Sequence, residues 1–156
     1  MNQEKIMKRR MINAILIAVI SLAALFIFIG LYSEEKSKVQ IKYREQYIEN
    51  LIEAHNEIDT YFDKNTDYDL HYNMILSDLG AARSFIFLMN NQDDRMNIAE
   101  KQKTINEFHY CFVKYPEQMR DKLMEADTAI SDIASGLDKG YDEAQAVVDS
   151  INKLGT

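Results

Sequence analysis

The residues of this chain that could do metal chemistry are its three histidines, His55, His71 and His109. A helical metal site usually brings two ligands onto one face through a Glu-x-x-His or a His-x-x-x-His pair, and none of the three histidines belongs to such a pair. His55 lies on an apolar stripe, which is typical of a hydrogen-bonded core histidine, whereas His71 and His109 have the pattern of surface or boundary residues. The sequence therefore predicts no metal site and no cofactor.

The single cysteine, Cys111, could act as a nucleophile, and His109 precedes it by two positions. Side chains two positions apart on a helix point to roughly opposite faces, so this pair cannot form the hydrogen-bonded couple that activates a thiolate. A small buried side chain is the expected role of Cys111. The carboxylates are scattered over polar faces, and no glycine-rich loop follows a strand. These patterns predict a protein that is not an enzyme.

The element around which the chain is organised is Met11–Tyr32, a run of 22 residues without a charged side chain. At ~1.5 Å per residue, a helix of this length reaches roughly 33 Å, which is enough to cross a hydrocarbon core of ~30 Å. A cleavable signal peptide is the alternative, because the basic leader 1–10 precedes the run. Signal peptides usually have an apolar region of ~7–15 residues and a small-x-small cleavage site, which Gly30–Ser33 does not offer. The sequence therefore predicts a transmembrane helix at 11–32.

The orientation of this helix follows from the charges that flank it. Four basic residues stand on each side, but Lys8, Arg9 and Arg10 adjoin the apolar run directly, whereas Glu34 and Glu35 come first on the other side. Cytoplasmic flanks of transmembrane helices are enriched in Lys and Arg. We therefore expect a single-pass protein of the cell membrane with a cytoplasmic N-terminus and an extracytoplasmic domain at 33–156.

The composition of residues 33–156 limits both their fold and their partners. The chain has 25 acidic and 18 basic residues, of which the leader holds one and four, so 24 acidic and 14 basic residues remain. This balance argues against nucleic acid and against adsorption to anionic lipid headgroups. Five glycines and one proline are too few for an all-β fold, which needs turn residues every ~8–12 positions. The predicted class is all-α, with one small domain.

Apolar residues that recur at steps of three and four predict helices at about 34–62, 67–90, 94–114, 116–138 and 141–154. No Gly or Pro lies between Ser33 and Gly80, so the transmembrane helix can continue into the first of these. Short connections make neighbouring helices antiparallel, which gives an up-down-up-down four-helix bundle with a short fifth helix. The clearest stripe is that of the second helix: Tyr68, Tyr72, Ile75, Leu79, Ala82, Ile86 and Met89.

Signals at the helix ends support these boundaries. Thr66 or Asp67 can cap the second helix, and Asn90–Asp94 forms a polar turn after it. Pro116 suits the first turn of the fourth helix, and Gly140 is the expected cap at its C-terminus.

Phe85, Phe87 and Leu88 depart from the stripe of the second helix, because Phe85–Met89 is apolar at every position. One face of a bundle cannot cover all of them, and exposed apolar patches usually mark contacts. We predict that the three residues bind a partner at the end of the bundle that faces the bilayer. Burial beneath the fifth helix, or beneath the first part of the first helix, is the alternative.

Ala14 and Ala18 form a small-x-x-x-small pair in the apolar segment, and such pairs let two transmembrane helices approach closely. The sequence therefore offers a helix-contact face at Ala14 and Ala18, with a plain lipid-facing anchor as the alternative.

The function that requires no further motif is that of a structural or adaptor subunit. Its expected partners are the lipid bilayer and another membrane or envelope protein, or a second copy of the chain, with neither nucleic acid nor metal. The alternative is a ligand sensor, because the layout resembles that of the extracytoplasmic sensing bundles of chemoreceptors and sensor kinases. That resemblance extends to no motif residues.

Overall fold

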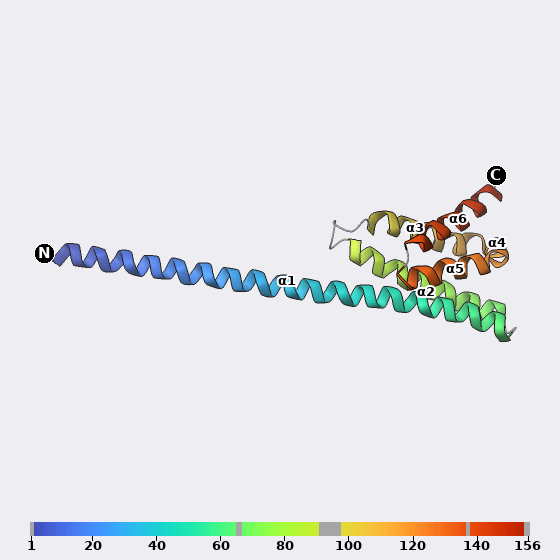
Figure 1. The fold of residues 1–156 in the computed structure, drawn as a ribbon, viewed down its shortest axis with the longest axis horizontal. Helices are drawn as coiled ribbons and strands as arrows, with labels where there is room; N and C mark the ends of the chain where they lie inside the picture. The colour runs from blue at the N-terminus through green and yellow to red at the C-terminus, as the bar shows by residue number, and fades with distance from the viewer. Residues whose placement is uncertain (1, 65–66, 91–97, 137, 155–156) are drawn as a thin grey trace. The chain divides into compact units, whose positions relative to one another are not determined.

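The computed structural model describes residues 2–64, 67–90, 98–136 and 138–154 (Figure 1), and every regular element among them is an α-helix. The all-α class predicted from the sequence is therefore confirmed. The chain divides into two units, Met1–Val39 and Gln40–Thr156. The helices are α1 (Asn2–Lys64), α2 (Tyr68–Asn90), α3 (Ile98–Lys114), α4 (Pro116–Asp121), α5 (Leu123–Ala134) and α6 (Lys139–Leu154).

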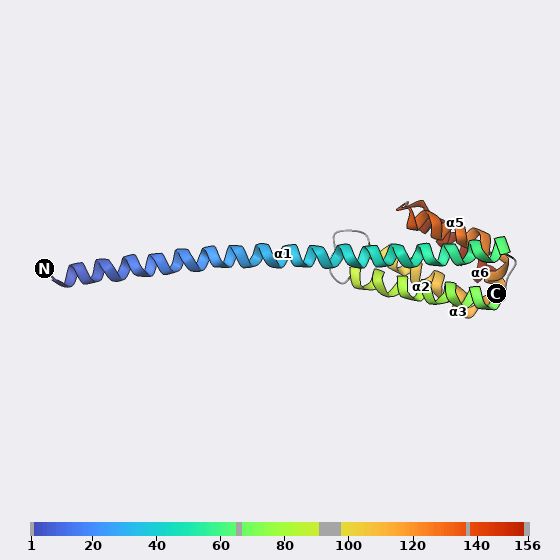
Figure 2. The same ribbon diagram turned by 90° about the horizontal axis from the view of Figure 1, so that it is seen from below.

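Helix α1 has no break between Asn2 and Lys64, as the absence of Gly and Pro after Ser33 predicts (Figure 2). It is long and apolar enough to cross a membrane. The described side chains of residues 3–38 are all exposed, whereas Tyr47, Leu51 and Ala54 further along the same helix are buried. One helix thus supplies an apolar segment in the first unit and a core-forming segment in the second.

The core of the second unit consists of the apolar stripes of its helices. Tyr72, Leu79 and Ile86 of the predicted α2 stripe are buried, and so are Phe108 and Phe112 of α3. The regular three-and-four spacing places these side chains on one face of each helix, and burial of that face supplies most of the stability. The remaining core residues are Ile58, Ile75, Ala82, Ile98, Ile105, Cys111, Met119, Leu123, Ala126, Ala129, Ile130, Ile133, Ala144, Val147, Val148 and Ile151.

Helix α2 runs antiparallel to the distal part of α1. The ring centroids of Tyr61 and Tyr68 are 5.3 Å apart at the end of α1, and those of Tyr43 and Phe85 are 6.2 Å apart near the end of α2. Asp67 caps α2 as predicted, because its Oδ1 accepts hydrogen bonds from the N–H groups of Asp69 and Leu70, at 3.0 and 3.4 Å. Thr66 and most of the expected turn at Asn90–Asp94 lie outside the described residues.

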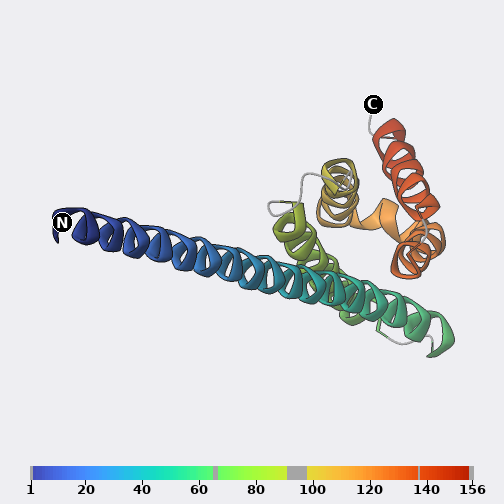
Figure 3. The same cartoon turned by 60° about the vertical axis from the view of Figure 1, so that its left-hand side comes forward.

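The remaining helices close the bundle (Figure 3). The Tyr72 hydroxyl donates to the carbonyl oxygen of Phe112 at 2.7 Å, which ties α2 to α3. Helix α6 packs against both α5 and α3. The Tyr47 and Tyr141 hydroxyls, 3.0 Å apart, join α6 to α1.

The helix expected at about 116–138 is two helices, α4 and α5, with Lys122 between them. The Lys122 N–H donates to the carbonyl oxygen of Met119 at 3.1 Å, which tightens the turn. No Gly or Pro marks this point. Met119 and Leu123 are buried on the two sides of the break, and the Arg120 guanidinium lies 4.3 Å from the ring centre of Tyr68. Packing on both sides fixes the bend against the local helix preference.

The glycine that ends α5 is Gly136, so the prediction of Gly140 as the cap is wrong. Gly136 has a φ of +79°, and its N–H donates to the carbonyl oxygen of Ile133 at 2.9 Å. Gly140 lies instead in the first turn of α6, where a Cβ atom would come within 2.7 Å of the Ile133 nitrogen. Its lack of a side chain allows α6 to start against the backbone of α5.

Candidate functional site

The three predicted partner-binding residues have different environments at the C-terminal end of α2. Phe85 is half-buried, packs against the core and contacts the ring of Tyr43. Phe87 is 51% exposed and Leu88 37% exposed. Phe85 therefore fits the alternative given above, burial beneath the first helix of the bundle, because it lies against Tyr43 of α1. Phe87 and Leu88 are the exposed pair.

Phe87 and Leu88 line a groove between α2 and α3 with a volume of about 620 Å³. Its other lining residues are polar: Arg83, Ser84, Gln102 and Asn106. We call the surface formed by these six residues the α2–α3 groove. It joins two exposed apolar side chains to a rim of amide, hydroxyl and guanidinium groups, which is the usual composition of a protein contact surface.

Hydrogen bonds hold the rim of the α2–α3 groove in place. Arg83 Nε donates to Asn106 Oδ1 at 2.9 Å, and Asn90 Nδ2 donates to Gln102 Oε1 at 2.7 Å. Both bonds join α2 to α3, so the two walls of the groove are fixed relative to each other. A fixed surface loses less conformational entropy when it binds.

Ala14 and Ala18 lie one turn apart on α1, with both side chains exposed. This spacing puts them on the same face of the helix, as the predicted contact motif requires. The assignment of this face to a second transmembrane helix stays a prediction.

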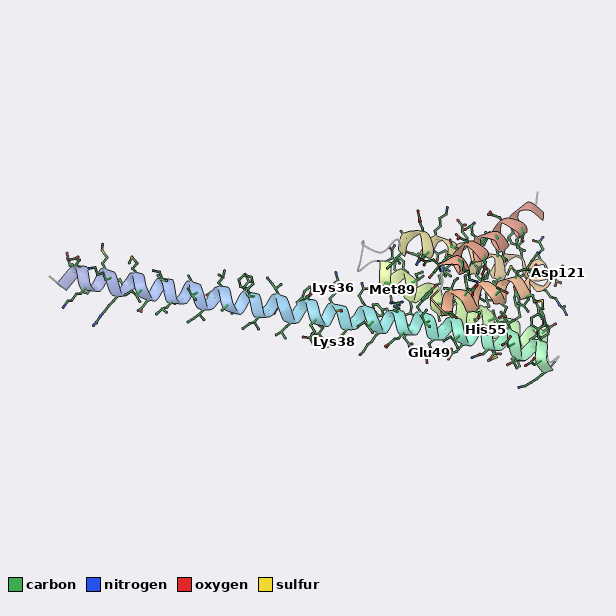
Figure 4. All side chains as sticks on the ribbon, viewed as in Figure 1. Lys36, Lys38, Glu49, His55, Met89 and Asp121 are labelled. Atoms are coloured by element: carbon green, nitrogen blue, oxygen red, sulfur yellow. The ribbon has the colours of Figure 1, made fainter. Side chains whose placement is uncertain are left out.

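His55 is half-buried and hydrogen-bonded, as its position on the apolar stripe indicated. Figure 4 labels His55 on α1. Its Nδ1 lies 2.6 Å from Asp127 Oδ1 on α5. Its Nε2 faces Asp59 Oδ2 on its own helix at 3.6 Å. The cluster of His55, Asp59 and Asp127 was not predicted from the sequence. The spacing His55-x-x-x-Asp59, which places both side chains on one helix face, was the available signal.

The prediction of a surface or boundary position is wrong for His71, which is only 8% exposed. Its Nδ1 lies 2.7 Å from Glu57 Oε2, because α2 turns this side chain toward α1. His109 is half-buried, as predicted, and burial, followed by the charge of Arg83, lowers its pKa. Cys111 is buried, and burial, followed by the charge of Glu107, raises the pKa of its thiol. A raised thiol pKa disfavours the reactive thiolate.

No protein-family model, curated protein or solved structure shows significant similarity to the chain. The function has therefore to be inferred from the residues and contacts themselves.

Proposed function

We propose that this chain is a single-pass membrane protein whose helical bundle is a structural or adaptor subunit, and that the bundle binds another membrane or envelope protein through the α2–α3 groove. The apolar segment 11–32 of α1 would be the anchor. The positions of Lys8, Arg9 and Arg10 favour a cytoplasmic N-terminus and an extracytoplasmic bundle.

The observation that carries the proposal is that Phe87 and Leu88 are exposed although the neighbouring apolar residues of α2 pack in the core. Ile86 and Met89 already serve the core, and Phe87 and Leu88 point about 100° and 200° away from Ile86. Burial of such side chains in a partner is worth roughly 1.5–3 kcal/mol each. An aromatic ring and a leucine together can therefore serve as the centre of an interface.

The rim of the α2–α3 groove indicates the chemistry of the partner. Gln102 and Asn106 carry amide groups that both donate and accept, and Arg83 adds donors. Such groups suit the backbone and uncharged polar side chains of a protein around an apolar centre. An adaptor that docks an apolar side chain of a neighbouring protein would use this surface.

The position of the groove in the chain suits a partner that is itself held at a membrane. The end of α2 lies beside Tyr43, which is 11 residues after Tyr32. A connection of this length spans at most ~40 Å even when fully extended. Only a short stretch of sequence therefore separates the proposed anchor from the part of α1 that lies beside the groove-bearing helix.

The test is the double change Phe87→Ser with Leu88→Ser in the full-length protein, followed by crosslinking in cells and quantitative mass spectrometry of the proteins captured. We expect the captured partner to fall at least tenfold, since the lost burial exceeds ~1.4 kcal/mol. The matched control is Tyr110→Ser with Val113→Ser, which removes two side chains of α3 that are 54% and 53% exposed.

Thermal melting separates an interface from a structural role. A Phe87/Leu88 variant that melts like the parent and loses a protein retained by the Tyr110/Val113 variant supports the proposal. Unchanged capture would contradict it, and so would a loss of several degrees in Tm, which would mean that the pair stabilises the fold.

A further inference from the structure

His55 lies between two aspartates that face opposite nitrogens of its ring. Asp127 Oδ1 on α5 is 2.6 Å from Nδ1, a good hydrogen-bond distance. Asp59 Oδ2, one turn along α1, is 3.6 Å from Nε2, which is too long for a hydrogen bond. The contact with Asp127 is therefore a hydrogen bond, whereas the contact with Asp59 is not.

The short contact decides which ring nitrogen carries the proton of the neutral imidazole. An ionised Asp127 carboxylate can only accept, so in that state Nδ1 is the donor of this contact. The lone pair of the neutral ring is then on Nε2, where it faces the carboxylate of Asp59. A protonated ring would form an ion pair with Asp59 at this distance, and a metal ion held between a neutral ring and Asp59 would stabilise the same arrangement.

The separation of Nε2 and Asp59 fits two ligands of one metal ion. Tetrahedral Zn²⁺ binds imidazole nitrogen at ~2.0–2.1 Å and carboxylate oxygen at ~2.0–2.2 Å, which places the two ligand atoms roughly 3.4 Å apart. The observed 3.6 Å is close to that value. One ligand atom from each of His55, Asp59 and Asp127 lies within 4.8 Å of the other two.

We propose that His55 Nε2 and Asp59 bind a divalent transition-metal ion, with Zn²⁺ the best fit, and that Asp127 is the positioning residue that orients the imidazole. A carboxylate that accepts from the far nitrogen of a metal-bound histidine is the usual outer partner of such sites. Imidazole and carboxylate together suit Zn²⁺, Ni²⁺ and Cu²⁺, whereas Mg²⁺ and Ca²⁺ prefer oxygen ligands.

The site is open to further ligands. The side chain of Asp59 is 58% exposed and that of His55 is 28% exposed, so water or a group from another protein can complete the coordination sphere. Asp127 is 20% exposed, as suits a residue that orients the ring from the bundle side. Both proposed ligands lie on α1, and the hydrogen bond between His55 and Asp127 connects them to α5.

The test is a calorimetric titration of untagged, full-length protein in detergent micelles with ZnCl₂, and with MgCl₂ as comparison. We expect one Zn²⁺ per chain and no Mg²⁺ at the same concentrations. Asp59→Asn should weaken Zn²⁺ binding at least tenfold. Asp127→Asn keeps both ligands and should weaken it 10- to 100-fold. The matched control, Asp63→Asn, changes another exposed α1 aspartate one turn further on and should bind like the parent.

The ¹⁵N resonances of the His55 ring separate the two aspartate roles. Zn²⁺ at Nε2 with a proton retained on Nδ1 supports the assignment, whereas Zn²⁺ at Nδ1 overturns the orienting role of Asp127. Absence of Zn²⁺ binding at millimolar concentration, or equal binding by the Asp59→Asn and Asp63→Asn variants, overturns the site. Circular dichroism should show that all three variants retain the parent's helicity.

Discussion

Asp78 on α2 is a half-buried carboxylate that faces other acids. Burial, followed by the charges of Glu53 and Glu57 on α1, raises its pKa to about 6. In the unfolded chain an aspartate titrates near ~3.9. Folding therefore favours the protonated form, and the stability linked to Asp78 is fully present below about pH 4 and is lost as the pH rises through about 6.

This linkage predicts that Asp78→Asn stabilises the protein at pH 7.5 and has little effect at pH 4. The gain should be less than about 1 kcal/mol, because solvent screens a carboxylate that is only partly buried. Thermal melts of parent and variant between pH 4 and pH 8 provide the measurement. Glu45→Gln, which changes an exposed carboxylate of α1, is the matched control. A lower melting temperature for Asp78→Asn at pH 7.5 would show that its charge is favourable.

Residue environments were predictable from the sequence where they depend on one helix and not where they depend on two. The stripe of the first bundle helix was enough to indicate a hydrogen-bonded His55. The burial of His71 depends on how α2 faces Glu57 of α1, and the contact of His55 with Asp127 joins positions 72 apart in the chain. No local pattern encodes either contact.

At the scale of elements, the three-and-four spacing predicted the helical segments of the bundle but merged α4 and α5 into one helix. The spacing is informative because burial of one face is the main source of helix stability in a folded domain. Asp67 predicted the start of α2, because a short acidic side chain can cap the N-terminus of a helix. The bend at Lys122 had no local signal, since it results from burial of Met119 and Leu123 on its two sides. The roles of Gly136 and Gly140 were likewise set by the way α6 meets α5.

The close approach of α5 and α6 predicts that Gly140→Ala destabilises the protein. At Gly140 a Cβ atom would lie 2.7 Å from the Ile133 nitrogen and 2.9 Å from the Ala129 oxygen, both of them backbone atoms. Gly140→Ala should therefore lower the free energy of unfolding by about 1–3 kcal/mol, the usual cost of overpacking.

Gly80→Ala is the matched control within α2. Its nearest neighbour would be the His109 Nε2 atom at 3.4 Å, an ordinary contact with a side chain. Because Ala is the better helix former, this change should be neutral or stabilising by up to ~1 kcal/mol. Urea unfolding of both variants tests the pair. Equal midpoints for Gly140→Ala and the parent would mean that α6 does not need this close approach.

At the scale of the whole molecule, the sequence predicted the helical class, a long apolar helix and the region of the candidate surface. The sequence did not separate the half-buried Phe85 from the exposed Phe87 and Leu88. All three are apolar, and they differ only in how far α1 covers each side chain. No motif in the sequence identifies the proposed partner, since a protein interface needs shape and exposed area rather than fixed residue types.

The membrane orientation is the prediction on which the choice of partner depends. Two single-cysteine variants on a Cys111→Ala background test it: Met124→Cys on α5, where the side chain is 71% exposed, and Gln3→Cys in the leader. Lys8, Arg9 and Arg10 should hold the leader in the cytoplasm. A membrane-impermeant maleimide should therefore label the Met124→Cys variant in intact cells, and the Gln3→Cys variant only after permeabilisation. The reverse pattern would place the bundle and its partner in the cytoplasm. A shortened protein that carries label at position 124 and none at position 3 after permeabilisation would mean that the apolar segment is a cleaved signal peptide, and that the partner binds a soluble bundle.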